Sequence, residues 1–242
     1  MDMNSPTGKE ILALVRKADY AHAGEEEAID IVFKGIPKDP SRLLLDVGCG
    51  RGGTAQYLQH KGLGKVLGID IDRESISYAK KTYPDVEYLV GDAGNFAETT
   101  NRRFDVIYLF NVFYALAHKR TLEQLHILSR KSGRLIIFDY LLKAKDQKVF
   151  PFKEWNPLDF SVTHNLFLES GWHIVKTEDI SDLYKEWYRV LVSRIEASSN
   201  KIIAMAGEEW FDFVRSFYSK IVAAIQENLL GGAIVYALNS TG

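Results

Sequence analysis

The chain has 242 residues, 46% of them hydrophobic and 26% charged, and its 30 basic and 32 acidic side chains leave a formal net charge of −2. This balance gives no basic excess for binding nucleic acid, and no apolar run approaches the ~20 residues of a membrane span. The single cysteine, Cys49, excludes a disulfide framework and a cysteine-based zinc site. The first twenty residues mix charges with short apolar runs, so we expect a soluble, cytoplasmic protein without a secretory signal.

The first part of the chain predicts two helices followed by an alternation of strands and helices. Residues 6–35 have helical spacing, and Gly35, Pro37 and Pro40 end that pattern. Short, continuously apolar strands then alternate with amphipathic helices, which indicates a parallel sheet covered on both faces. The expected strands are residues 43–47, 65–69, 86–90, 104–110 and 135–138, and the expected helices between them are residues 54–60, 74–82 and 121–130.

The pattern changes after residue 140. We expect a helix over 158–170, a strand over 172–177, two long helices over 181–228 and a last strand over 233–238. Because a long helical stretch separates the last two strands, it is predicted to be a cap inserted between them. The predicted domains are an N-terminal helical clamp (1–40), an α/β core (41–180 with 231–242) and the helical cap (181–230).

A glycine-rich loop follows the first expected strand and reads Asp46-Val47-Gly48-Cys49-Gly50-Arg51-Gly52-Gly53. Glycine is needed where the backbone approaches a ligand closely or takes a positive φ. One interpretation is the dinucleotide fingerprint, with Asp70 about 20 residues further on to bind a ribose hydroxyl. The other is the first motif of S-adenosylmethionine-dependent methyltransferases, which begins with the acidic residue.

The chemistry of three turns favours the second interpretation. Asp46 would repel a pyrophosphate but suits the methionyl end of S-adenosylmethionine, which carries an ammonium and a sulfonium. Asp70 and Ile71 offer a carboxylate for the ribose hydroxyls and an apolar surface for adenine. Asp92 and Ala93 offer a carboxylate for the adenine amino group and a backbone amide for a ring nitrogen. We expect these turns to meet, since ligands of open α/β sheets bind at the carboxyl ends of the strands.

On these motifs, residues 43–139 resemble the core of class I S-adenosylmethionine-dependent methyltransferases. The resemblance implies a Rossmann-like α/β fold, with a seven-stranded, mostly parallel sheet and an antiparallel final strand. It also implies S-adenosylmethionine as cofactor and S-adenosylhomocysteine as product. No group of His, Asp and Glu has metal-ligand spacing, so no metal is expected. The expected cofactor-binding residues are Tyr20, Asp46, Gly48, Cys49, Gly50, Asp70, Ile71, Asp92, Ala93 and Asn111.

Flanking segments resemble small-molecule N-methyltransferases, in particular the phosphoethanolamine methyltransferases. The similar segments are Tyr20-Ala21-His22-Ala23-Gly24, Phe138-Asp139-Tyr140 and Asp179-Ile180-Ser181-Asp182-Leu183-Tyr184. The resemblance implies that Tyr20 and Tyr140 act at the acceptor, and His22 is a candidate acid–base group. The chain departs from that family in having Ala115 where those enzymes carry a His, and Lys153 is the nearest candidate for their phosphate-binding basic residue.

Aromatic side chains are concentrated in the predicted cap, and one or two of them facing the site would stabilise a cationic acceptor. The expected substrate-binding residues are Tyr140, Tyr184, Trp187 and Tyr188. We therefore predict methyl transfer to a small molecule, most simply an amine, without a nucleic-acid or membrane partner. The alternatives are an O- or C-methyltransferase of a small acid or hydroxyl compound, an RNA or protein methyltransferase, a noncatalytic S-adenosylmethionine-binding protein and, on the first interpretation of the loop, a dinucleotide oxidoreductase.

Overall fold

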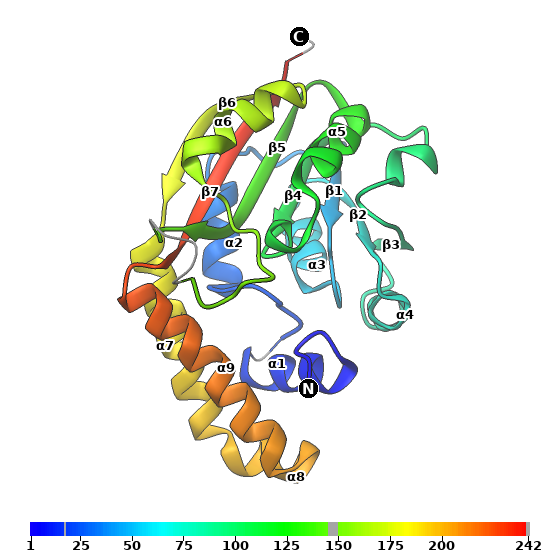
Figure 1. Ribbon diagram of the computed structural model, residues 1–242. Coiled ribbons are helices and arrows are strands. Elements are labelled where there is room, and N and C mark those ends of the chain that lie inside the picture. Colours follow the sequence, from blue (N-terminus) through cyan, green and yellow to red (C-terminus); the bar gives the residue numbers. More distant parts are fainter. Residues whose placement is uncertain (17, 145–149, 241–242) are drawn as a thin grey trace.

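The computed structural model describes residues 1–16, 18–144 and 150–240, and its centre is a seven-stranded sheet (Figure 1). The strand order is β3-β2-β1-β4-β5-β7-β6, in which β7 is antiparallel to β5 and β6 and the other neighbours are parallel. This confirms the predicted mostly parallel sheet with an antiparallel final strand. The strands are β1 Leu43–Val47, β2 Lys65–Asp70, β3 Glu87–Val90, β4 Phe104–Phe110, β5 Ser129–Leu142, β6 Trp172–Asp179 and β7 Leu230–Asn239.

Helices cover both faces of this sheet, as the continuous apolar strands predict. One core contains side chains of α2, α3 and α4 and of the helices that follow β6, and the other contains side chains of α5 and α6. The helices are α1 Pro6–Arg16, α2 Glu25–Phe33, α3 Gly53–His60, α4 Arg73–Thr82, α5 His118–Leu128, α6 Phe160–Glu169, α7 Ser181–Ala197, α8 Ser199–Ala206 and α9 Glu208–Gln226, with short 3₁₀ turns η1 Phe96–Glu98 and η2 Phe113–Ala115.

The fifth strand is longer than the sequence predicts. The expected strand ended at residue 138, whereas β5 continues to Leu142 because β7 pairs with it from Arg134 to Leu142. Pairing with a strand almost a hundred residues away is a tertiary effect that local pattern does not contain. It extends the strand beyond Tyr140 to Leu141 and Leu142.

The segment between β6 and β7 contains three helices, not the two that were expected. Ser198 ends α7, and Gly207, with φ of 93°, separates α8 from α9. Figure 1 shows these helices extending beyond the carboxyl edge of the parallel strands, beside α1. The segment therefore lies at the edge where ligands of open α/β sheets bind.

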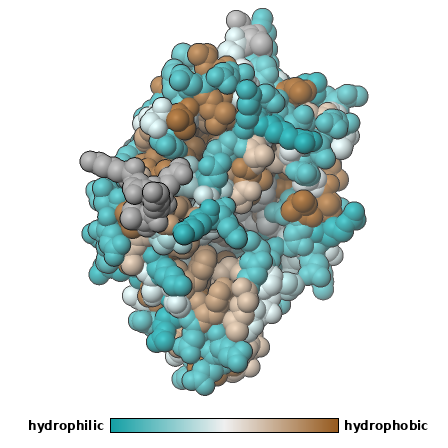
Figure 2. All heavy atoms as spheres, in the orientation of Figure 1, coloured by the Kyte–Doolittle hydropathy of each residue, from teal (hydrophilic) through white to brown (hydrophobic). Residues whose placement is uncertain are grey.

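The described helices include none that is long and apolar enough to cross a membrane. In the view of Figure 2, the hydrophobic surface residues form separate patches surrounded by hydrophilic ones.

Candidate functional site

The glycine loop after β1 has a conformation that requires glycine. Gly48, Gly50 and Gly52 have φ values of 74°, 52° and 88°. A Cβ on Gly48 would lie 2.6 Å from the Val112 side chain, and one on Gly52 would lie 2.5 Å from the Tyr88 hydroxyl. The loop is therefore packed between the end of β4 and β3, and larger residues would displace it.

Asp70, at the end of β2, connects the glycine loop to the turn that follows β2. Its carboxylate accepts hydrogen bonds from the N–H of Gly50 at 2.8 Å and the N–H of Asp72 at 2.9 Å. The next side chain, Ile71, is 72% exposed, which is unusual for a large aliphatic residue at a strand end. An exposed apolar side chain beside a carboxylate fits the predicted contacts with adenine and ribose.

Asp46 and Cys49 lie deeper than Asp70. Asp46 is 2% exposed, stands opposite Tyr108 in the pairing of β1 with β4, and its Oδ2 atom has no hydrogen-bond partner among the described residues. The pKa of Asp46 is raised to about 8, mainly by burial. The Tyr108 hydroxyl acts in the opposite direction, and the negative charge of Asp70 adds to the increase. The Cys49 side chain is buried against Gly68, so only its backbone is available to a ligand in the loop.

Asp92 and Ala93 follow β3, on the far side of β2 from the glycine loop. The Asp92 carboxylate is exposed and accepts a hydrogen bond from the N–H of Gly94 at 2.8 Å, while Ala93 is buried. Since β3, β2 and β1 are adjacent and parallel, the structure brings the three predicted turns to one edge of the sheet. Their binding of a cofactor stays a prediction.

The segment before α2 covers the glycine loop. A Cβ on Gly53 would lie 2.7 Å from the backbone oxygen of Asp19, so the two chains are in direct contact. Tyr20 is 6% exposed, and its hydroxyl donates a hydrogen bond to Glu26 at 3.1 Å. The predicted clamp thus places Tyr20 over the loop, with a carboxylate beside its hydroxyl.

His22, expected as an acid–base group, is 1% exposed. Because a carbonyl oxygen can only accept, its Nδ1 donates to Ala23 at 3.0 Å and its Nε2 accepts from the Thr54 hydroxyl at 3.0 Å. Burial lowers the pKa of His22 to about 3. Both ring nitrogens are occupied and the ring is neutral, which favours a packing role for His22 over proton transfer.

Asn111 connects three parts of the molecule at the end of β4. Its side-chain oxygen accepts from the backbone N–H of Ala23 at 3.3 Å, and its side-chain nitrogen donates to the Tyr184 hydroxyl at 3.0 Å. Its φ of 49° is a conformation that asparagine tolerates better than most residues. The clamp, the sheet and α7 therefore meet at Asn111.

Tyr140, Tyr184 and Tyr188 form one buried aromatic cluster. The Tyr140 and Tyr188 hydroxyls are hydrogen-bonded to each other, and the rings of Tyr140 and Tyr184 lie 5.8 Å apart. Burial raises the pKa of all three hydroxyls, so they act as hydrogen-bond donors rather than as bases near neutral pH. The structure brings these predicted substrate residues together.

The sequence analysis missed two members of this cluster. The rings of Tyr114 and Trp155 lie 5.1 Å and 4.6 Å from the ring of Tyr140. Tyr114 could have been found from its place in the short turn after β4, three residues beyond Asn111. Trp155 carries no such signal, because it lies in an irregular segment that follows β5.

Tyr20 and Trp187 line a different space from Tyr140 and Tyr188. They border a cavity of about 460 Å³ between the clamp and α7, together with Arg16 and Arg194. The Trp187 indole N–H donates to Glu27 at 2.9 Å, which ties α7 to α2. The predicted substrate residues are thus divided between a buried cluster and the wall of this cavity.

Asp139, between Phe138 and Tyr140, holds the turn that follows β4. It is fully buried and accepts hydrogen bonds from the N–H groups of Phe113 at 2.6 Å, Tyr114 at 3.3 Å and Tyr140 at 2.7 Å. Burial raises the pKa of Asp139 to about 7, and the hydrogen bonds from these backbone N–H groups limit the increase. Asp139 therefore positions Tyr114 and Tyr140. Within the described residues, no group of three or more His, Cys, Asp or Glu side chains could hold a metal ion.

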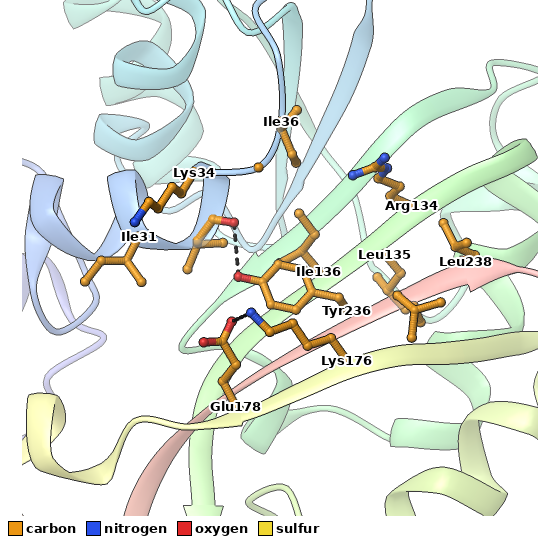
Figure 3. A pocket seen from close by; sticks show the side chains of 14 residues that line it. Ile31, Lys34, Ile36, Arg134, Leu135, Ile136, Lys176, Glu178, Tyr236 and Leu238 are labelled. Carbon is orange, nitrogen blue, oxygen red and sulfur yellow. Dashed lines mark hydrogen bonds and ion pairs between the residues drawn. The ribbon is translucent and has the colours of Figure 1, made fainter.

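A larger cavity, of about 690 Å³, lies elsewhere on the molecule (Figure 3). It is bordered by α2 and by the strands β5, β6 and β7, and none of the predicted site residues lines it.

The sheet order and the glycine loop define a Rossmann-like α/β domain in which the loop lies at the carboxyl ends of the parallel strands. Residues 44–133 match the family model described as a methyltransferase domain. Phosphoethanolamine N-methyltransferase 1 of Arabidopsis thaliana is 27% identical over 194 residues, which are 75% of this chain and 39% of that protein. The chain spans half or less of the length of the first curated relatives that it matches.

Two solved structures share the fold. Phosphoethanolamine N-methyltransferase 2 of Haemonchus contortus, in complex with phosphomonomethylethanolamine and S-adenosylhomocysteine, has a TM-score of 0.84 at 16% identity, covering 96% of this chain and 57% of that chain. The cyclopropane synthase MmaA2 of Mycobacterium tuberculosis has a TM-score of 0.83 at 14% identity, covering 97% and 94%. The match of residues 44–133 to a methyltransferase domain supports the resemblance to class I S-adenosylmethionine-dependent methyltransferases, and the two structures show that the chain has the same fold as these enzymes.

Proposed function

We propose that this protein transfers a methyl group from S-adenosylmethionine to a small molecule, an amine, at the place where the clamp, β4 and α7 meet. The observation that carries the proposal is the position of Asn111. It lies at the carboxyl edge of the sheet, hydrogen-bonded to both Ala23 and Tyr184, with the aromatic cluster directly behind it. The neighbouring cavity between the clamp and α7, of about 460 Å³ and lined by Gly24 and Trp187, has the size of a small-molecule pocket and suits a small acceptor better than a polymer.

The residues at the strand ends fit the cofactor. The buried Asp46 Oδ2 has no partner among the described residues and would be satisfied by a cationic group. Asp70 offers a carboxylate for ribose hydroxyls, and the exposed Ile71 offers an apolar surface for adenine. Asp92 and the backbone of Ala93 complete the adenosine end. When bound, the cofactor supplies an electrophilic methyl group on a sulfonium.

The residues of this chain would orient the acceptor, exclude water and remove a proton. At the 460 Å³ cavity, Tyr20 and Trp187 provide aromatic faces, which stabilise a cation by about 0.5–2 kcal/mol, and the buried cluster of Tyr140, Tyr184 and Tyr188 supports Trp187 from behind. The hydroxyl of Tyr20 donates to Glu26, which borders the 460 Å³ cavity. We propose that an amine loses its proton toward this carboxylate, since His22 and Asp139 are fully engaged elsewhere.

The names of the relatives support an N-methyltransferase, but Ala115 argues against the phosphoethanolamine substrate of those proteins. The alternative is O- or C-methylation of a small acid or hydroxyl compound. We further propose that residues 1–40 act as a clamp and residues 181–230 as a lid over the core, and that the protein is cytoplasmic.

Methyl-labelled S-adenosylmethionine tests the proposal. The protein is incubated with it and with a cell extract separated into small-molecule and macromolecular fractions, and the labelled products are identified by mass spectrometry. We expect label in small amines, and at least tenfold less transfer by an Asp70→Ala variant when S-adenosylmethionine is limiting. Label confined to RNA or protein would contradict a small acceptor, and cofactor binding without any transfer would indicate a noncatalytic binding protein.

A further inference from the structure

We propose that the 690 Å³ groove between α2 and the strands β5, β7 and β6 is a second binding site, for a small amphipathic carboxylate. Arg134 on β5 lines this groove, whereas Tyr140 lies six residues further along the same strand. At about 3.3 Å per residue, the two positions are roughly 20 Å apart. The groove is therefore separate from the proposed methyl-transfer site.

The groove beside α2 leaves several apolar side chains partly exposed. Ile31 on α2 and Tyr236 and Leu238 on β7 are half-buried and border the groove in Figure 3, whereas Ile136 on β5 is buried in the core. At the edge strand, Val175 is 53% exposed. Apolar side chains that stay open around one groove mark a binding surface.

The rim of the groove carries cations without partners. Lys34, just after α2, and Arg134 are both exposed, and neither forms an ion pair with any residue that the structure describes. The one carboxylate on the rim, Glu178, is already paired with Lys176 at 2.8 Å. The rim is thus locally positive on a chain whose net charge is −2.

These features define the chemistry of the occupant. A mostly apolar space of this size with a few charged groups at its rim is typical of small-molecule pockets, which range from about 300 to 1,000 Å³. A guanidinium binds a carboxylate through two parallel hydrogen bonds, and Arg134 is free to do so. The geometry therefore points to a ligand with a hydrocarbon body on the sheet and a carboxylate at Arg134 or Lys34.

Decanoate is the probe, and its binding is measured by displacement of the fluorescent anion 1-anilinonaphthalene-8-sulfonate. The protein is first saturated with S-adenosylhomocysteine, so that the methyl-transfer site is blocked. We expect decanoate to bind at one site, and decanol, which lacks the charge, to bind at least tenfold more weakly. The double variant Lys34→Glu and Arg134→Glu should weaken decanoate binding at least tenfold, and so should Val175→Asp.

Lys201→Glu, on α8, is the matched control and should bind decanoate as the wild type does, because Lys201 is equally exposed but far from the groove. Thermal unfolding verifies that each variant is folded, and Arg134→Gln replaces the double variant if charge reversal impairs folding. Absence of decanoate binding, equal binding of decanol, or unchanged binding by the groove variants would each overturn the proposal. Sedimentation of the same variants shows whether a second copy of the chain occupies the groove instead, which would also overturn it.

Discussion

Replacing Asp70 by alanine tests the cofactor site most directly. The Asp70 carboxylate accepts hydrogen bonds from the N–H groups of Gly50 and Asp72, at 2.8 Å and 2.9 Å, and it is the group proposed to hold the ribose. A hydrogen bond to a charged group contributes about 1.5–3 kcal/mol. Since this side chain is only partly buried, the lower end of that range applies to each bond. The loss of one to two such contacts in the complex corresponds to about a 10- to 100-fold weaker affinity for S-adenosylmethionine.

Isothermal titration calorimetry with S-adenosylhomocysteine measures this affinity without turnover. Asp70→Asn, which keeps one acceptor oxygen, should lose less affinity than Asp70→Ala. Asp85→Ala, in the exposed turn before β3, is the control and should bind as the wild type does. An Asp70→Ala variant that is folded and binds with unchanged affinity would show that the ribose is not held at the end of β2.

Three further predictions concern the acceptor site, the cap and pH. Tyr140→Phe removes the hydroxyl that pairs with Tyr188 and should lower kcat about tenfold or more while the cofactor Kd stays unchanged; an unchanged kcat would remove Tyr140 from the site. Hydrogen exchange in residues 181–226 should slow when S-adenosylhomocysteine binds, and equal exchange in both states would indicate a rigid appendage. The folded-state pKa of Asp46, about 8, lies above its unfolded value near 3.9, so this group lowers stability progressively as pH rises from 4 to 8, by up to about 1.4 kcal/mol per pH unit. Asp46→Asn should remove that slope in denaturant unfolding, and an identical slope in the variant would mean that Asp46 ionises normally.

The sequence by itself determined the sheet and the edge at which the glycine loop lies. Continuous apolar strands that alternate with helices give a parallel sheet, and the glycines of residues 48–53 occupy positions where positive φ or close packing excludes a side chain. Asp46 and Asp70 lie in the last two residues of β1 and β2, and Asp92 lies two residues after β3, so all three are at one edge of the sheet. Such features are local in the chain, because strand periodicity and backbone conformation depend on neighbouring residues.

Only the tertiary structure decided what surrounds that edge. The length of β5 depends on its pairing with β7, and the burial of His22 depends on Thr54 and on the sheet beneath it. Likewise, Tyr20 and Trp187 share a cavity while Tyr140 packs in a separate cluster, a division that no spacing in the sequence indicates. Each of these outcomes rests on contacts between segments far apart in the chain, and the energy of such contacts comes from burial and hydrogen bonding that a local pattern does not encode.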